Sequence, residues 1–199
     1  MIATSRGPSA GLNKLRERFP AALETETVDI IDLDSVRALR SRLRGRNLDT
    51  LFVNAGICKA TELTPVQVDE KDYLDMMLTN ALSPMRVVEL FYDLVVENGV
   101  IAVISSEIGS ITNSTVFWEL YSSSKAALNM LMKCFAARRA GDPRALLLVA
   151  PGWVRTEMGT SAAPLSIEES IPFVVETVEQ SRGKPGLRFI DRNGRALPW

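Results

Sequence analysis

The sequence contains no histidine. This absence excludes Ser-His-Asp and Cys-His catalysis, and it removes the ligand sets on which zinc hydrolases usually depend. We therefore expect no catalytic metal, and any general acid or base must be a Tyr, Lys, Asp, Glu or Cys side chain. Only two cysteines are present, Cys58 and Cys134, and a reducing compartment would keep both as thiols.

Long apolar runs and an excess of charge are also missing. No run approaches the roughly 20 apolar residues that cross a bilayer, and residues 1–11 lack the apolar core of a signal peptide. The 23 basic residues nearly balance the 24 acidic ones, so the overall charge favours neither a nucleic acid nor a membrane as partner. We expect a single cytoplasmic domain over residues 1–199.

Short β-rich runs alternate with longer helical patterns along the whole chain, which predicts an α/β fold with a parallel sheet and helices on both faces. Strands are expected at residues 2–5, 27–31, 51–53, 100–104, 145–149 and 187–190. Helices are expected around residues 12–19, 36–43, 65–97, 121–139 and 167–178, the third of these as two helices that meet near Asn80.

Tyr121 and Lys125 lie four residues apart in an expected helix, which places their side chains on one face with Cβ atoms about 5–6 Å apart. A phenol titrates at about 10 in isolation, and a neighbouring ammonium favours the phenolate. We therefore expect the pKa of Tyr121 to be lowered toward neutral pH. The same spacing also arises by chance in solvated helix pairs, so it needs support from other residues.

The strand expected at residues 100–104 gives that support, because it leads into Ser105, Ser106 and Gly109. A hydroxyl at the carboxyl end of a sheet strand lies where open α/β folds bind their ligands. Residues 54–56, Asn-Ala-Gly, end another expected strand, and such a small turn lets the backbone approach a ligand closely. It could equally be an ordinary strand-ending turn.

These motifs make the sequence similar to the short-chain dehydrogenase/reductase family. The resemblance is carried, in the family's order, by LFVNAG, an Asn in the following helical region, ISSEIG, YSSSK and APGWVRT. The ending GLRFIDRNGRALPW most resembles the small C-factor-like branch. The resemblance implies a Rossmann-like doubly wound parallel sheet. It also implies a nicotinamide-dependent oxidoreductase that reduces a carbonyl group, or oxidises an alcohol, by hydride transfer.

The resemblance assigns catalytic roles to four residues. Tyr121 would be the general acid or base at the carbonyl oxygen, and Lys125 would lower its pKa and hold the nicotinamide ribose. Ser106 would polarise the same oxygen. Asn80 would hold a water that links Lys125 to solvent, although an Asn between two helices could instead cap one of them.

The choice of Ser106 over Ser105 depends on Gly109, which lies three residues beyond Ser106 as in the family's pattern. Further contacts with an NAD(P) cofactor are implied for Tyr121, Lys125, Arg6, Asp29, Ile30, Asn54, Ala55, Gly56, Pro151, Gly152, Val154 and Thr156. Substrate contacts are implied for Ile108, Phe117, Trp118, Trp153 and Met158, although the aromatic members could equally be loop packing. A homodimer or homotetramer would follow the family's pattern.

The family's first strand and its glycine-rich turn, which holds the cofactor pyrophosphate, have no counterpart in the sequence. Residues 7–11, Gly-Pro-Ser-Ala-Gly, follow a strand and open a helix. However, the stretch between this turn and Asn54 has room for only one strand where the family has two. The sequence therefore begins one βα unit late in the family's pattern, and we expect cofactor binding to be weakened or lost.

On this alignment Arg6 directly follows the family's second strand and would face the adenosine ribose, unless it is an ordinary surface arginine. With no acidic residue at that strand end, a 2′-phosphate is favoured over a free hydroxyl, and so NADP(H) is favoured over NAD(H). Asp29, with Ile30 beside it, matches the family's acid near the adenine ring.

Three interpretations stay open. The chain could be a reductase whose start lies further upstream, a shortened enzyme with altered cofactor use, or a truncated non-catalytic homologue that acts through protein-protein contacts or signalling. Retention of all four catalytic positions argues against a long-standing loss of chemistry.

Overall fold

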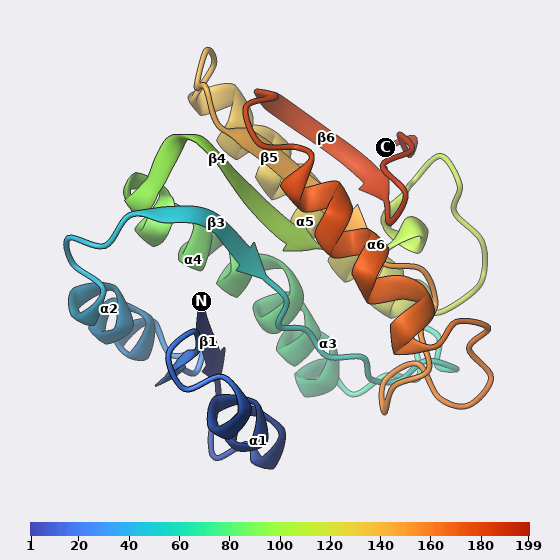
Figure 1. The fold of residues 1–199 in the computed structure, drawn as a ribbon. Coiled ribbons are helices and arrows are strands. Elements are labelled where there is room, and N and C mark those ends of the chain that lie inside the picture. Colours follow the sequence, from blue (N-terminus) through green and yellow to red (C-terminus); the bar gives the residue numbers. More distant parts are fainter. The chain divides into compact units, whose positions relative to one another are not determined.

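The computed structural model describes residues 1–199, and strands alternate with helices along the whole chain (Figure 1). The strands are β1 (Ile2–Ser5), β2 (Glu24–Thr27), β3 (Leu48–Val53), β4 (Val95–Ile104), β5 (Ala145–Ala150) and β6 (Gly186–Asp191). The helices are α1 (Ala10–Arg18), α2 (Leu33–Arg42), α3 (Glu70–Met77), α4 (Ser83–Phe91), α5 (Glu119–Arg138) and α6 (Ile167–Glu179). Three short helical turns are η1 (Leu78–Leu82), η2 (Tyr92–Leu94) and η3 (Glu107–Gly109).

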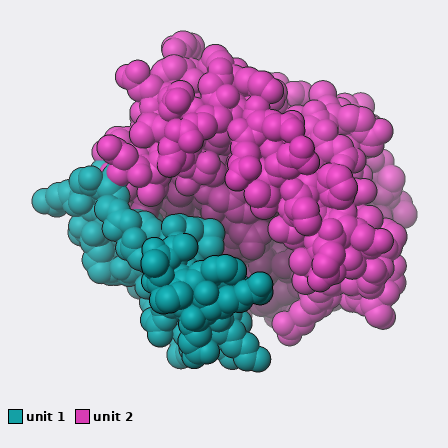
Figure 2. All heavy atoms as spheres, in the orientation of Figure 1, with its two compact units in different colours: residues 1–46 teal, residues 47–199 magenta.

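The chain divides into two compact units, Met1–Arg46 and Asn47–Trp199 (Figure 2). β1 and β2 pair in parallel in the first unit, and β3, β4, β5 and β6 form a parallel sheet, in that order, in the second. The predicted α/β, Rossmann-like fold class is confirmed. The single domain expected over residues 1–199 stays a prediction.

The sheet of the second unit is covered on both faces, with α6 on one side and α4 and α5 on the other (Figure 1). Alternation along β4 explains this arrangement, because successive side chains of a strand point to opposite faces. Ile101 and Val103 pack with residues of α4 and α5, whereas Val100 and Ala102 pack with residues of α6. Both layers are closed to solvent, which fixes the carboxyl ends of the strands relative to α5.

Several predicted boundaries were wrong, and the helix expected from residue 65 begins only with α3, at Glu70. The strand expected at residues 27–31 lies at Glu24–Thr27, because β1 pairs Ser5 with Thr27 and the chain turns directly afterwards. In that turn the Asp29 side chain accepts a hydrogen bond from the main chain of Ile31. Residues 95–97, expected in a helix, begin β4, where Val95 pairs with Leu48 of β3.

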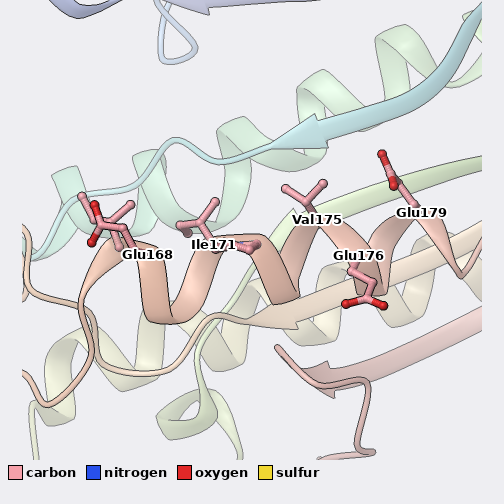
Figure 3. Close-up of a pocket in the computed structure, with 7 residues that line it drawn as sticks. Glu168, Ile171, Val175, Glu176 and Glu179 are labelled. Carbon is pink, nitrogen blue, oxygen red and sulfur yellow. The ribbon is translucent and has the colours of Figure 1, made fainter.

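A shallow groove along the outer side of α6 is lined by Ile167, Glu168, Ile171, Pro172, Val175, Glu176 and Glu179. Ile171 and Val175 project from the same side of the helix (Figure 3). None of the predicted site residues lines this groove, so it is distinct from the candidate active site. No helix of the chain combines the length and the apolar character that crossing a membrane requires.

Candidate active site

Three adjacent parallel strands bring the predicted motifs to one edge of the sheet. β3 leads into residues 54–56, β4 leads into Ser106, and β5 leads into Pro151 and Gly152. Because β3 pairs with β4 and β4 with β5, all in parallel, the carboxyl ends of these strands lie side by side. This edge is where open α/β sheets bind ligands.

Tyr121 and Lys125 lie near the start of α5 and are both buried, with 8 % and 2 % of their surface exposed. The Lys125 Nζ atom is 5.7 Å from the centre of the Tyr121 ring, so the pair shares one face of the helix as predicted. Nζ also donates a hydrogen bond of 3.0 Å to the main-chain oxygen of Ile104, the last residue of β4. This bond ties the pair to the strand end that carries the serines.

Burial raises the pKa of Tyr121, which corrects the lowered pKa expected from the sequence. Desolvation is the largest cause, and the negative charge of Cys58, when that residue is ionised, acts in the same direction. Desolvation also lowers the pKa of Lys125 to about 8, with a smaller opposing effect of Cys58. The Lys125 ammonium is directed at the oxygen of Ile104, so it does not offset the cost of burying a phenolate. Tyr121 is therefore a neutral phenol, the form that can donate a proton.

Ser105 and Ser106 have different surroundings. Ser105 is buried, and its Oγ atom donates a hydrogen bond of 2.7 Å to Oδ1 of Asn129 on α5. Ser106 is half-buried, and its side chain does not cap η3. The Ser105 hydroxyl is thus committed to a structural bond, which favours Ser106 as the serine that can reach a ligand.

The short turn η3 packs tightly against α5. A Cβ atom at Gly109 would lie 2.9 Å from the Lys125 Cβ atom and 3.3 Å from Nδ2 of Asn129, so a larger residue would force η3 away. The Asn129 Nδ2 atom also donates a hydrogen bond of 3.1 Å to the Gly109 oxygen. Asn129 therefore holds both ends of the Ser105–Gly109 segment against the helix that carries Tyr121 and Lys125.

Asn80 is fully buried in η1, a single π-helical turn between α3 and α4. Its side chain accepts a hydrogen bond from the Ile57 nitrogen (2.8 Å) and donates to the Ile57 oxygen (2.8 Å) and to Oγ of Ser124 (3.0 Å). The capping alternative is therefore wrong, because these bonds join the loop after β3 to α5. A π-helical turn often marks a functional site, where it redirects a side chain.

The small turn at residues 54–56 passes close to this network. A Cβ atom at Gly56 would lie 3.3 Å from Oδ1 of Asn80 and 3.6 Å from Nζ of Lys125. Cys58 follows two residues later, and burial raises its pKa to about 11. It is consequently a neutral thiol near physiological pH, and its charge acts on Tyr121 and Lys125 only where it is ionised.

The residues after β5 form a loop that is closed by its own contacts. Val154 pairs with Leu165 in a short parallel bridge. Gly152 has a φ of 83°, and a Cβ atom there would lie 2.7 Å from Cδ1 of Leu165, so only glycine fits. Thr156 is exposed, and its Oγ1 atom accepts a hydrogen bond of 3.1 Å from the Gly159 nitrogen. Residues 151–156 thus form a loop at the same sheet edge whose conformation is held by its own contacts.

Most of the residues expected to contact substrate gather around Tyr121. Ile108 and Trp118 belong to the same apolar cluster as Tyr121, and ring contacts join Trp118 to Phe117 and Trp153. Met158 is exposed on the loop that also carries Trp153. The aromatic residues therefore contact one another across two loops, instead of packing separately within each loop.

The three remaining predicted cofactor residues belong to the first unit. Arg6 is exposed directly after β1, and Asp29 and Ile30 follow the end of β2. Because β1 and β2 pair in parallel, with Ser5 opposite Thr27, these residues lie at the carboxyl edge of their own sheet. Arg6 follows its strand as the sequence predicted, whereas Asp29 lies beyond the end of β2 and not within the strand expected at residues 27–31.

Sequence reasoning missed Asn129 and Ser124, which link Asn80, Ser105 and Gly109 to α5. A signal for Asn129 was present, because it lies four residues after Lys125 and therefore on the same helix face. A polar residue on a buried helix face requires a hydrogen-bond partner. Its two partners lie in a segment that is distant in sequence, and only the fold identifies them.

Replacement of Asn129 by Leu, which is similar in size, should lower the free energy of unfolding by about 2–4 kcal/mol. The variant leaves Ser105 Oγ and the Gly109 oxygen buried without their partner, and each such group costs about 1–3 kcal/mol. Chemical denaturation measures the change, with Met130→Leu, an exposed substitution one residue away, as the control. Equal stability of the two variants would contradict the assigned role of Asn129.

The buried pair of Tyr121 and Lys125 is thus bonded to the end of β4, two residues before Ser106, at the carboxyl edge of a parallel sheet. The family model described as short chain dehydrogenase matches residues 2–165, so the chain belongs to the short-chain dehydrogenase/reductase family and is an enzyme of that class.

Several known proteins are similar to this chain over most of its length. A short-chain dehydrogenase/reductase from Burkholderia multivorans with bound NADP matches with a TM-score of 0.97 and 47 % identity, covering 100 % of this chain and 87 % of the other. A carbonyl reductase from Pseudomonas aeruginosa PAO1 in complex with NADP matches with a TM-score of 0.90, 37 % identity and the same coverage. The C-signal protein of Myxococcus xanthus is 28 % identical over 170 residues, which is 82 % of this chain and 100 % of that protein.

Proposed function

We propose that this protein reduces a carbonyl compound to an alcohol with NADPH, and that Tyr121 is the acid that protonates the carbonyl oxygen. The observation that carries the proposal is the convergence of Tyr121, Lys125 and Ser106 at one edge of the sheet. The neutral state of Tyr121 agrees with this direction of the reaction, because a phenol donates a proton whereas a phenolate accepts one.

Each of the four residues has a distinct part in the proposed reaction. The Ser106 hydroxyl donates a hydrogen bond to the carbonyl oxygen and polarises it. Tyr121 gives its proton to that oxygen as the carbon receives hydride, and a proton from solvent then restores the phenol. Lys125 would hold the nicotinamide ribose, and Asn80 holds the loop after β3 against α5.

The residues of the site also fit a nicotinamide dinucleotide, which supplies the hydride when it is bound. The loops after β3 and β5 lie at the same sheet edge, where Gly56 passes close to Asn80 and Lys125 and Gly152 packs against Leu165. We assign the nicotinamide end of the cofactor to Lys125 and to the loop with Pro151, Gly152, Val154 and Thr156. In the second unit, Asn54 and Ala55 are also assigned to the cofactor. In the first unit, Arg6, Asp29 and Ile30 are assigned to the adenosine.

NADP(H) is the proposed form of the cofactor because of Arg6. A guanidinium beyond the end of β1 suits a 2′-phosphate better than a 2′-hydroxyl. Two structural relatives agree with this assignment, since the Burkholderia and Pseudomonas proteins were both determined with NADP.

Titration of the protein with NADPH and with NADH, followed by nicotinamide fluorescence, tests the proposal. We expect tighter binding of NADPH, together with loss of the nicotinamide absorbance when a ketone or an aldehyde is added. Binding of neither dinucleotide and no turnover would contradict the proposed function.

The same titration with Arg6→Glu tests the preference between the two dinucleotides. This variant should bind NADPH about tenfold or more weakly, because it places a carboxylate opposite the 2′-phosphate, and it should bind NADH nearly unchanged. Arg44→Glu, at an exposed position of the same unit, is the matched control for the change in charge. An equal loss of NADPH affinity in both variants would show a general charge effect instead.

A further inference from the structure

Three aromatic rings from two different loops form a cluster beside Tyr121. Phe117 and Trp118 are stacked, with ring centres 4.8 Å apart and an angle of 14° between the planes. Trp153, from the loop after β5, meets both rings edge to face at 5.6 and 5.9 Å. Trp118 in turn stands at 89° to the Tyr121 ring, 6.0 Å away. The cluster is therefore continuous with the residue that we assign as the acid.

The backbone of Trp118 is held in an unfavourable conformation. Its φ and ψ are both 49°, the left-handed region that side chains other than glycine rarely adopt. Such strain persists only where the surroundings determine the conformation, and it is often found at functional sites. Here the ring contacts fix the indole immediately before α5, which places it over Tyr121 instead of pointing away from the helix start.

The cluster presents apolar surface and few free polar groups. Phe117 and Trp153 keep 39 % and 37 % of their surface exposed, although both rings are packed against other rings. The Trp153 Nε1 atom already donates a hydrogen bond of 2.8 Å to the Gly159 oxygen. Arg155, the cation of the same loop, donates to the main-chain oxygens of Ala163 and Pro164 at 3.0 and 2.7 Å. A substrate carboxylate would have to compete for that guanidinium.

We propose that the substrate is an uncharged aromatic ketone or aldehyde whose ring packs on Phe117, Trp118 and Trp153 while its carbonyl group reaches Tyr121. This inference rests on the proposed function and adds the chemical class of the substrate. Aromatic rings prefer offset-stacked and edge-to-face partners, and a rigid cluster offers both kinds of contact. The neutral Cys58 thiol and the apolar residues packed around Tyr121 suit an uncharged molecule.

Acetophenone and cyclohexyl methyl ketone are the probes, because they have the same size and differ in whether the ring is planar and aromatic. Conjugation makes acetophenone the less electrophilic ketone, so KM and equilibrium binding are compared instead of kcat. We expect KM for acetophenone to be about five- to tenfold lower than for its saturated counterpart. In Trp118→Leu this ratio should fall toward one. Phe173→Leu, which removes an exposed aromatic ring on α6, should leave the ratio unchanged.

Ligand-observed NMR of both ketones without cofactor separates failure of this inference from failure of the proposed function. Preferential binding of acetophenone that is lost in Trp118→Leu supports the aromatic site even if no turnover is found. Reduction of both ketones with equal KM, or binding without preference, would overturn the inference and leave the reductase proposal intact. If Trp118→Leu weakened the binding of both ketones equally, the inference would also be overturned. The Trp118 ring would then support the shape of the site without recognising an aromatic substrate.

Discussion

Replacement of Tyr121 by phenylalanine should lower kcat for carbonyl reduction by about 100- to 10,000-fold, the range that a positioned general acid contributes. The variant keeps the aromatic ring and therefore the contacts with Trp118 and the surrounding apolar cluster. It removes only the hydroxyl, which burial keeps protonated in the free enzyme. Steady-state reduction of one ketone by wild type and variant, at saturating NADPH, measures the effect.

Tyr73→Phe is the matched control for this substitution. Tyr73 belongs to the same apolar cluster, and its hydroxyl lies 3.2 Å from Oγ of Ser123. Removal of that hydroxyl should change kcat by less than about threefold, because it costs one partly buried hydrogen bond of about 1 kcal/mol. Unchanged NADPH affinity in Tyr121→Phe would show that the site is still assembled. Comparable kcat values for Tyr121→Phe and wild type would remove Tyr121 from the proposed mechanism.

The positions of the chemical groups were largely predictable because parallel strands end at a common edge. Ser106 and Gly152 each follow an apolar run, and once those runs are taken as neighbouring parallel strands the two residues must lie close together. The pairing of β1 with β2 was harder to predict. The apolar residues Val28, Ile30 and Ile31 suggested a later strand, whereas the register with β1 ends β2 at Thr27. Register depends on contacts that are distant in sequence.

The pKa of Tyr121 shows what spacing alone does not determine. Positions four residues apart place Lys125 next to Tyr121, but the direction of the lysine side chain decides whether its charge reaches the phenol. In the fold Nζ bonds to the oxygen of Ile104, and desolvation becomes the dominant effect on Tyr121. That bond joins residues that are 21 positions apart, so the local sequence pattern around Lys125 does not predict it.

Replacement of Lys125 by methionine should stabilise the fold near neutral pH by about 1–2 kcal/mol and lower kcat by about 100-fold or more. Burial lowers the pKa of Lys125 from 10.5 to about 8, so below about pH 8 the fold must hold a buried ammonium. No carboxylate compensates this charge, and its one hydrogen bond, to Ile104, is worth less than the cost of desolvation. Methionine has a similar length and carries no charge. The variant therefore removes the cost of desolvating the ammonium, and it also removes the contribution of the Lys125 amine to the proposed reaction.

The difference in the free energy of unfolding between wild type and Lys125→Met should depend on pH. Between about pH 8 and 10.5 the folded protein releases the Lys125 proton before the unfolded chain does, so the free energy of unfolding of wild type should rise relative to that of Lys125→Met. The rise should total about 3 kcal/mol, since each pKa unit corresponds to about 1.4 kcal/mol. Cys58 and Tyr121 titrate in both proteins, and their contributions largely cancel in the difference. Denaturation of both proteins across this range measures it, with Lys184→Met at an exposed position as the control. A stability difference that stays constant with pH would show that Lys125 keeps an ordinary pKa. If Lys125→Met were less stable than wild type at neutral pH, the Lys125 charge would be compensated within the fold.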